Sequence, residues 1–267
     1  MRDSQKPIGI FDSGIGGLTV FKALTELMPS ERFVYLGDTA RVPYGTKSAD
    51  VVLKYALQDS LFLLDHGVKG IVIACNTASA YALDHLQGKL TVPVMGVIEP
   101  GARAGLAATK NHRIGIIGTE GTIRSGVYES VLKKMSERIF CLSKATGLFV
   151  PLVEEGVQHP EILKPIFHHY LSDFLVHNID TLILGCTHYP LLKDALQNFF
   201  GPSVSLVDSA QATAQAVQQK LRELELISHE KTKGDDQIFV TDAPDRVFRI
   251  AKSFLNGSNT AIQKVSL

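Results

Sequence analysis

The sequence predicts an α/β protein of two halves, each with a mainly parallel sheet flanked by helices. Short apolar runs typical of buried parallel strands alternate with segments whose apolar residues recur at three- and four-residue spacing. Two of these runs, Ile71–Thr77 and Leu182–His188, share one pattern, in which the run ends on a cysteine and continues directly into polar side chains. At 267 residues, the chain is long enough for two modest domains.

The expected strands are short apolar runs at Ile8–Phe11, Phe33–Gly37, Gly70–Ala74, Val92–Val97, Arg113–Ile117, Thr181–Gly185, Ser203–Val207 and Gln237–Thr241. Helical spacing between them predicts helices at Ser48–His66, Ile123–Met135, Glu161–His177 and Ala210–Leu226. We expect another helix to open after the glycine-rich turn that ends at Thr19, and one directly after each cysteine of the shared pattern. The polar stretch Ser228–Asp236 is predicted to be an exposed loop.

The repeated cysteine pattern also indicates where the halves meet. Cys75 and Cys186 are 111 residues apart (186 minus 75), close to the length of one small α/β domain. Pro100-Gly101 punctuates the chain and predicts a crossing there, and the return is expected near Val207-Asp208. The predicted domains are therefore residues 1–97 with 208–267, and residues 98–207.

The composition and net charge of the chain indicate which kinds of molecule it can bind. Lys plus Arg total 27 and Asp plus Glu total 27, so the formal net charge is zero and no electrostatic footprint for nucleic acid or an anionic membrane is expected. No apolar run approaches the ~18 residues of a membrane span, and the first residues lead directly into a strand. We therefore expect a cytoplasmic protein with a small-molecule partner. Three widely spaced cysteines favour reduced thiols over a disulfide framework or a four-ligand zinc site.

The first strand is followed by a glycine-rich turn, Phe11–Thr19, that opens a helix. A dinucleotide fingerprint would need glycine where Thr19 stands, and a P-loop would need lysine where Ile15 stands. Free backbone amides at a helix start instead suit a carboxylate ligand, and Asp12 and Ser13 lie at the strand tip. A purely structural turn is the alternative, although it leaves the acid unexplained.

A second turn-rich segment, Gly37–Gly45, follows the next strand, with Pro43 and Gly45 fixing its backbone. A capped surface loop would have the same composition. Because loops at the carboxyl edge of a parallel sheet carry function more often than their share, this segment is a candidate part of a site.

A lone cysteine at a strand end is usually a small buried apolar side chain, but two in matching contexts indicate chemistry. A helix starting after each thiol would favour the thiolate through its dipole. Cys141 lacks polar neighbours of this kind and is predicted to be a core residue.

The polar residues near the second thiol leave several interpretations open. The sequence allows three roles for His188: a core histidine, a metal ligand together with Cys186, or a proton partner for that thiol. Metal binding ranks last because no further ligands cluster with it. Glu154 and Glu155 are typical of a solvated pair, but their position after a strand-like run keeps them as candidates.

Two thiols suit one particular reaction. Strand ends in related halves can aim two side chains at one ligand from opposite sides. Inversion of a stereocentre next to a carboxylate needs a base on one face of the carbon and an acid on the other. Cysteine, with an ordinary pKa of about 8.5, can serve as either, and Asp12 or His188 can exchange the thiol proton. No pyridoxal phosphate is required.

Four segments in order closely resemble bacterial glutamate racemase, of the aspartate/glutamate racemase family: Asp12–Val20, Arg41–Gly45, Ala74–Ala80 and Gly185–Pro190. The resemblance runs from Ile8 to about Asp208 and includes Gly96–Gly101 and Gly118–Ile123. It implies two pseudo-symmetric α/β domains with the active site in the cleft between them. It also implies cofactor-independent interconversion of L- and D-glutamate, which supplies D-glutamate for peptidoglycan.

By the same resemblance, Cys75 and Cys186 are the paired acid and base, assisted by Asp12 and His188 respectively. The implied substrate-binding residues are Asp12, Ser13, Pro43, Tyr44, Gly45, Asn76, Thr77, Thr119, Glu154, Thr187 and His188. No metal and no cofactor are implied.

Three other readings stay open at this point. An aspartate racemase would differ in the size of its side-chain pocket. A cysteine hydrolase or transferase would use one thiol with His188 and leave the other without a role. A non-catalytic module would bind glutamate in a two-domain cleft without changing its optical rotation. A homodimer is among the assemblies to be tested.

Overall fold

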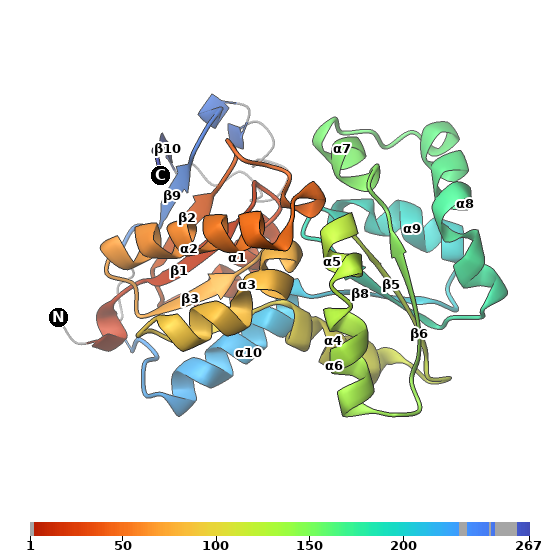
Figure 1. Cartoon of the computed structure of the whole chain (residues 1–267), viewed down its shortest axis with the longest axis horizontal. Coiled ribbons are helices and arrows are strands. Elements are labelled where there is room, and N and C mark those ends of the chain that lie inside the picture. Colours follow the sequence, from red (N-terminus) through yellow and green to blue (C-terminus); the bar gives the residue numbers. More distant parts are fainter. Residues whose placement is uncertain (1–2, 230–233, 246, 249–260) are drawn as a thin grey trace.

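The computed structural model describes residues 3–229, 234–245, 247–248 and 261–267. Two parallel sheets lie side by side in it, with helices packed on both faces of each sheet (Figure 1). The predicted α/β class is therefore confirmed. We call the sheet containing β1, with its covering helices, the first lobe, and the sheet containing β5, with its helices, the second lobe.

In the described part of the chain, the first sheet has the strand order β10-β9-β2-β1-β3-β4 and the second has the order β6-β5-β7-β8, with every pairing parallel. The strands of the first sheet are β1 Ile8–Asp12, β2 Phe33–Gly37, β3 Gly70–Ile73, β4 Val94–Gly96, β9 Gln237–Val240 and β10 Ile262–Lys264. Those of the second sheet are β5 Arg113–Gly118, β6 Phe140–Ala145, β7 Thr181–Gly185 and β8 Ser205–Asp208.

The helices are α1 Leu18–Leu27, α2 Ala49–Asp65, α3 Asn76–Lys89, α4 Ile98–Ala108, α5 Glu120–Arg124, α6 Val127–Met135, α7 Phe149–Glu154, α8 Pro160–Val176, α9 Lys193–Phe200 and α10 Ala210–Glu223. Among the described residues, the short 3₁₀ segments are η1 Asp3–Gln5, η2 Tyr44–Thr46 and η3 Tyr189–Leu192. None of the helices in the described part of the chain combines the length and the apolarity needed to cross a membrane.

Each sheet is buried on both faces, which explains why its central strands are almost continuously apolar. In the first lobe, α1 and α10 bury one face of the sheet and α2 and α3 bury the other. In the second lobe, α4 and α6 cover one face, and α7, α8 and α9 cover the other. Parallel strands end at one edge of their sheet, so each lobe gathers the loops that follow its strands at a single edge.

Two edge strands in the described part of the chain do not have the apolar pattern that predicts a strand. Phe140–Ala145, which is β6, is half-buried and includes Ser143 and Lys144, so it lacks the apolar run of a central strand. The other, β10, is short, and Ile262 is its one apolar residue. Cys141 lies on β6 and is half-buried against the core rather than inside it.

Pro100-Gly101 does not punctuate the chain as expected, because α4 runs through both residues. Pro100 lies in the first turn of that helix, where a missing backbone N–H costs nothing. The chain enters the second lobe at α4 and returns to the first at α10. The domain limits of 1–97 with 208–267 and of 98–207 stay a prediction. Residues 230–233 of the expected loop Ser228–Asp236 lie outside the described residues.

Candidate active site

A small cavity lies between the two lobes, where the carboxyl ends of strands from both sheets meet. Its volume is about 30 Å³, and its walls come from the loops that follow β1, β2, β3, β5 and β7 together with α7. The lining residues are Ser13, Val42, Pro43, Tyr44, Gly45, Cys75, Asn76, Thr77, Thr119, Thr122, Val150, Gly185, Cys186, Thr187 and His188.

The predicted site residues therefore come together, except that Asp12 and Glu154 do not line the cavity. Asp12 is fully buried at the end of β1, and Glu154 ends α7 and reaches His188 from outside. Four lining residues were not singled out from the sequence: Val42, Thr122, Val150 and Gly185. All but Val150 fall inside segments that carried the family resemblance, whereas Val150 is an apolar helix residue without any local signal.

Cys75 occupies the cavity wall of the first lobe. It is the N-cap of α3, and its sulfur accepts a hydrogen bond from the backbone N–H of Ala78 at 3.4 Å. Its thiol is 3.5 Å from the hydroxyl oxygen of Ser13. Burial, followed by the nearby carboxylate of Asp12, raises the pKa of Cys75 to about 12. The expected helix dipole is present at this thiol, but burial and the carboxylate outweigh it, so Cys75 is a neutral thiol at pH 7.

Asp12 connects the two lobes beneath the cavity. Its carboxylate accepts from the backbone N–H of Gly14 at 3.0 Å and from the hydroxyl of Thr187, in the second lobe, at 3.5 Å. Burial raises its pKa, while His188 and these hydrogen bonds act in the opposite direction. The carboxylate is thus placed to hold Thr187 and to act electrostatically on Cys75.

Cys186 occupies the opposite wall, at the end of β7. Its sulfur lies 3.9 Å from Nδ1 of His188, and Nε2 of the same ring lies 3.3 Å from Oε1 of Glu154. The second contact has ion-pair distance without hydrogen-bond geometry, since Nε2 has no hydrogen-bond partner among the described residues. Burial alone would lower the pKa of His188, but Cys186 and Glu154 outweigh burial and raise it to about 10. His188 is therefore an imidazolium at pH 7.

The helix expected directly after Cys186 is not present. The chain continues from His188 into the 3₁₀ segment η3, and α9 begins only at Lys193. The positive charge beside this sulfur therefore comes from His188 and not from a helix N-terminus.

Threonine hydroxyls join the lobes along one side of the cavity. Thr77, from the first lobe, lies 2.8 Å from Thr119 and 3.1 Å from Thr122, both from the second lobe, measured between hydroxyl oxygens. Gly45 permits this approach, because a Cβ there would lie 2.5 Å from the Cβ of Thr119. The hydroxyls form a polar wall that can donate to or accept from a ligand.

A buried polar network holds the loop that carries Pro43, Tyr44 and Gly45. The Tyr44 hydroxyl oxygen lies within hydrogen-bond distance of carboxyl oxygens of both Asp38 and Asp59, at 2.5 and 2.8 Å, and its one hydrogen can be donated to either. Arg41 donates to the same two carboxylates, at 2.6 and 2.9 Å. Burial and the two carboxylates raise the pKa of Tyr44 well above its usual range. Tyr44 thus contributes its ring to the cavity wall, while its hydroxyl is committed to the loop.

The glycine-rich turn after β1 also has a steric role. A Cβ at Gly16 would overlap Thr187 Oγ1 and His188 Nδ1 of the other lobe. Glycine at this position therefore lets the turn contact the segment that follows Cys186.

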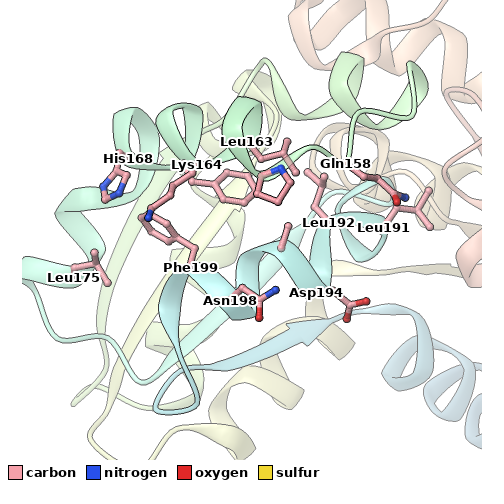
Figure 2. A pocket seen from close by; sticks show the side chains of 13 residues that line it. Gln158, Leu163, Lys164, His168, Leu175, Leu191, Leu192, Asp194, Asn198 and Phe199 are labelled. Atoms are coloured by element: carbon pink, nitrogen blue, oxygen red, sulfur yellow. The ribbon is translucent and has the colours of Figure 1, made fainter.

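A second, larger cavity lies elsewhere in the described part of the chain. It measures about 680 Å³ and lies between α8 and α9, where Figure 2 shows Leu163, Phe199 and Leu192 facing the same space, with Lys164 and Asp194 at its sides. No cysteine and no predicted site residue lines it. Convergent chemistry, and not volume, therefore marks the cavity between the lobes as the candidate active site.

The cavity between the lobes is closed to ligands of amino-acid size in this conformation. Ligand pockets usually measure roughly 300 to 1,000 Å³, whereas this one has room for water. Its walls are joined across the lobes by side-chain hydrogen bonds rather than by a covalent link. Entry of a larger ligand therefore requires the walls of this cavity to rearrange.

Comparison with known proteins identifies related sequences over nearly the whole chain. A sequence model of the family described as Asp/Glu/Hydantoin racemase matches residues 19–217. The glutamate racemase of Geobacter metallireducens is 48% identical over 262 residues, which cover 98% of this chain and 97% of that protein.

Solved structures agree with this relationship. A glutamate racemase isoform of Bacillus anthracis superposes with a TM-score of 0.95 at 35% identity, covering 99% of this chain and 98% of that one. The glutamate racemase of Francisella tularensis, solved in complex with D-glutamate, superposes with a TM-score of 0.90 at 38% identity over 99% and 98% of the two chains.

Proposed function

The chain belongs to the Asp/Glu/hydantoin racemase family, and from this premise we propose that it interconverts L- and D-glutamate without a cofactor, using Cys75 and Cys186 as acid and base. The observation that carries the proposal is the placement of two thiols from different lobes on the wall of one cavity. Two such groups can reach opposite faces of the same carbon atom. The close relatives named as glutamate racemases support glutamate as the substrate.

The proton transfer balances with the two sulfurs alone. The thiolate takes the α-proton from one face, so the C–H bond breaks and an S–H bond forms. The opposite thiol gives its proton to the other face, so its S–H bond breaks and the inverted C–H bond forms. The reverse reaction uses the same two groups in exchanged roles, and exchange with solvent restores the starting protonation.

The surroundings of the two sulfurs suggest which role each holds in the resting protein. The imidazolium of His188 lies 3.9 Å from the sulfur of Cys186, where it can stabilise negative charge that develops on that atom. The raised pKa of Cys75, which is about 12, keeps that group a thiol. We therefore propose that Cys186 is the resting base and Cys75 the resting acid. Asp12 and His188 act as the charges that maintain this difference.

The polar residues of the cavity wall would hold the two carboxylates and the ammonium group of glutamate. Ser13, Thr77, Thr119 and Thr187 contribute hydroxyls, and the amide of Asn76 contributes a donor. Separation of the lobes would admit the substrate, and closure would then exclude water from the two sulfurs. The D-glutamate formed would serve peptidoglycan synthesis.

Circular dichroism of L- and D-glutamate, with no cofactor added, tests the proposal. We expect wild-type protein to bring either enantiomer to an optically inactive mixture, while Cys75→Ala and Cys186→Ala each lower the rate by at least about a thousandfold, because one half of the acid–base pair is then lost. Cys141→Ala is the matched control, and it should racemise glutamate at close to the wild-type rate.

Two results would contradict the proposal. Activity of Cys75→Ala near the wild-type level would indicate single-thiol chemistry with His188. Turnover of aspartate but not of glutamate would assign a different substrate.

A further inference from the structure

Asn76 has one end of its amide committed and the other end unused. It is 3% exposed, begins α3 and lines the cavity directly after Cys75. Its Oδ1 accepts a hydrogen bond of 2.7 Å from the hydroxyl of Tyr128. Its Nδ2 is buried and has no hydrogen-bond partner in the described part of the chain. Because buried amide groups are normally paired, this NH₂ group is a donor waiting for an acceptor from outside the protein.

Tyr128 determines which end of the amide stays free. A tyrosine hydroxyl has one hydrogen to donate, and Oδ1 of Asn76 accepts it. If the amide turned over, Nδ2 would face the hydroxyl oxygen, the hydroxyl hydrogen would lose its acceptor and Oδ1 would take the place of the free donor. Nδ2 would then donate to the hydroxyl oxygen, but the buried hydroxyl hydrogen and Oδ1 would both be left unpaired. Each unpaired buried group costs about 1 to 3 kcal/mol, so the orientation seen here is favoured.

The ring of Tyr128 has little freedom to adopt another position. It is 3% exposed, and one of its edge carbons lies 3.2 Å from where a Cβ of Gly185 would be. Its hydroxyl lies 3.2 Å from where a Cβ of Gly101 would be. Two glycines, one of them adjacent to Cys186, thus leave space that this ring fills.

We propose that Tyr128 is a positioning residue, which sets the amide of Asn76 so that its NH₂ group donates to a carboxylate oxygen of the substrate. The inference rests on the proposed function, since the substrate is taken to be glutamate. The reversed amide would present an acceptor at the same place and would suit the ammonium group instead. The orientation therefore selects which charged group of the substrate binds next to Cys75.

The contact also connects recognition with closure of the lobes. Tyr128 comes from α6 of the second lobe, and Asn76 comes from α3 of the first. Separation of the lobes breaks their hydrogen bond and releases the amide. The donor is then set only when the lobes close on the substrate.

Tyr128→Phe is the direct test, because it removes the hydroxyl and keeps the ring. We expect the KM for both enantiomers to rise about tenfold while kcat changes less than about threefold, as the amide loses its fixed orientation. Tyr81→Phe is the matched control. The Tyr81 hydroxyl also joins α3 to the second lobe, but it donates its hydrogen to the carbonyl oxygen of Gly121, at 2.9 Å, rather than to Asn76. Its loss should change KM less than about twofold.

Two further variants separate positioning from general support of the fold. In an Asn76→Ala background, Tyr128→Phe should add less than about twofold to KM, because the amide it acts on is absent. Asn76→Asp keeps an acceptor for Tyr128 but replaces the free donor with an oxygen, so KM should rise at least tenfold.

Several outcomes would overturn the inference. These are an unchanged KM in Tyr128→Phe or in Asn76→Asp, an equal rise in KM in Tyr81→Phe, or an undiminished effect of Tyr128→Phe in the Asn76→Ala background. Wild-type protein that fails to racemise glutamate would overturn the proposed function instead.

Discussion

The two cysteines occupy almost the same place in their lobes but have opposite electrostatic surroundings. Each follows a central strand of its sheet and lines the same cavity, and the two residues are 6% and 7% exposed. Cys75 lies near the carboxylate of Asp12, whereas Cys186 lies beside the imidazolium of His188. Burial is therefore matched, and the charge of the neighbour is what differs. The repeated backbone pattern places the two cysteines in similar positions. The charged residue next to each cysteine then determines which of them acts as the acid and which as the base.

The rate of alkylation by iodoacetamide should show this difference most strongly. A thiol reacts as its thiolate, and a pKa of about 12 leaves roughly one Cys75 in 10⁵ ionised at pH 7. After allowing for the greater nucleophilicity of a more basic sulfur, we expect Cys186 to react at least about a hundredfold faster. The Cys75 rate should continue to rise with pH up to about 12. Mass spectrometry of a Cys141→Ala background would measure both rates.

Asp12→Asn provides the matched control for this experiment. Removing the negative charge should lower the pKa of Cys75 and speed its alkylation at pH 7, while Cys186 is affected less. Equal alkylation rates of the two cysteines in the parent protein would contradict the assignment of acid and base.

Loss of the imidazolium should have the next largest effect. His188→Asn retains a neutral donor near Cys186 but removes the positive charge beside its sulfur. A charge-assisted hydrogen bond contributes about 1.5 to 3 kcal/mol, so kcat/KM should fall about thirtyfold. Because the two enantiomers have equal free energies in water, the fall must be the same in both directions. A loss smaller than threefold would show that His188 does not support the base.

Glu154→Gln should have the smallest effect at neutral pH and a larger one at alkaline pH. Glu154 helps to raise the pKa of His188 to about 10, and the imidazolium loses its proton as the pH rises through that value. With a neutral glutamine the pKa falls, so the alkaline loss of kcat/KM should begin at lower pH. We expect about a threefold loss at pH 7. If the dependence of kcat/KM on pH between 7 and 10 were unchanged in this variant, Glu154 would not be responsible for the raised pKa of His188.

Much of the fold and the site is predictable because each central strand is a short continuous run of apolar residues, which can be recognised without knowing the rest of the structure. Phe33–Gly37 and Thr181–Gly185 were predicted with the bounds that the structure has, since strands buried on both faces are apolar throughout. Edge strands such as Phe140–Ala145 escape this rule because one side is partly exposed. Pro100 and Gly101 do not interrupt the chain, since α4 runs through both and a proline is tolerated in the first turn of a helix.

The contacts between lobes could not be predicted in the same way. Nothing near Tyr128 in the sequence indicates that its hydroxyl reaches Asn76, which is 52 positions away along the chain. Similarly, the sequence places Glu154 near a strand-like run, whereas its contact with His188 depends on how α7 packs against η3. Such pairings follow from tertiary packing, which local periodicity does not encode.

Transfer of solvent deuterium tests the central claim most directly. Wild-type protein in deuterated water, given either pure enantiomer, should place deuterium at the α-carbon of the product while the remaining substrate stays largely protiated at early times. This result requires separate bases on the two faces. Early deuterium in substrate and product alike would instead indicate one shared base, and the two-thiol account would then be wrong.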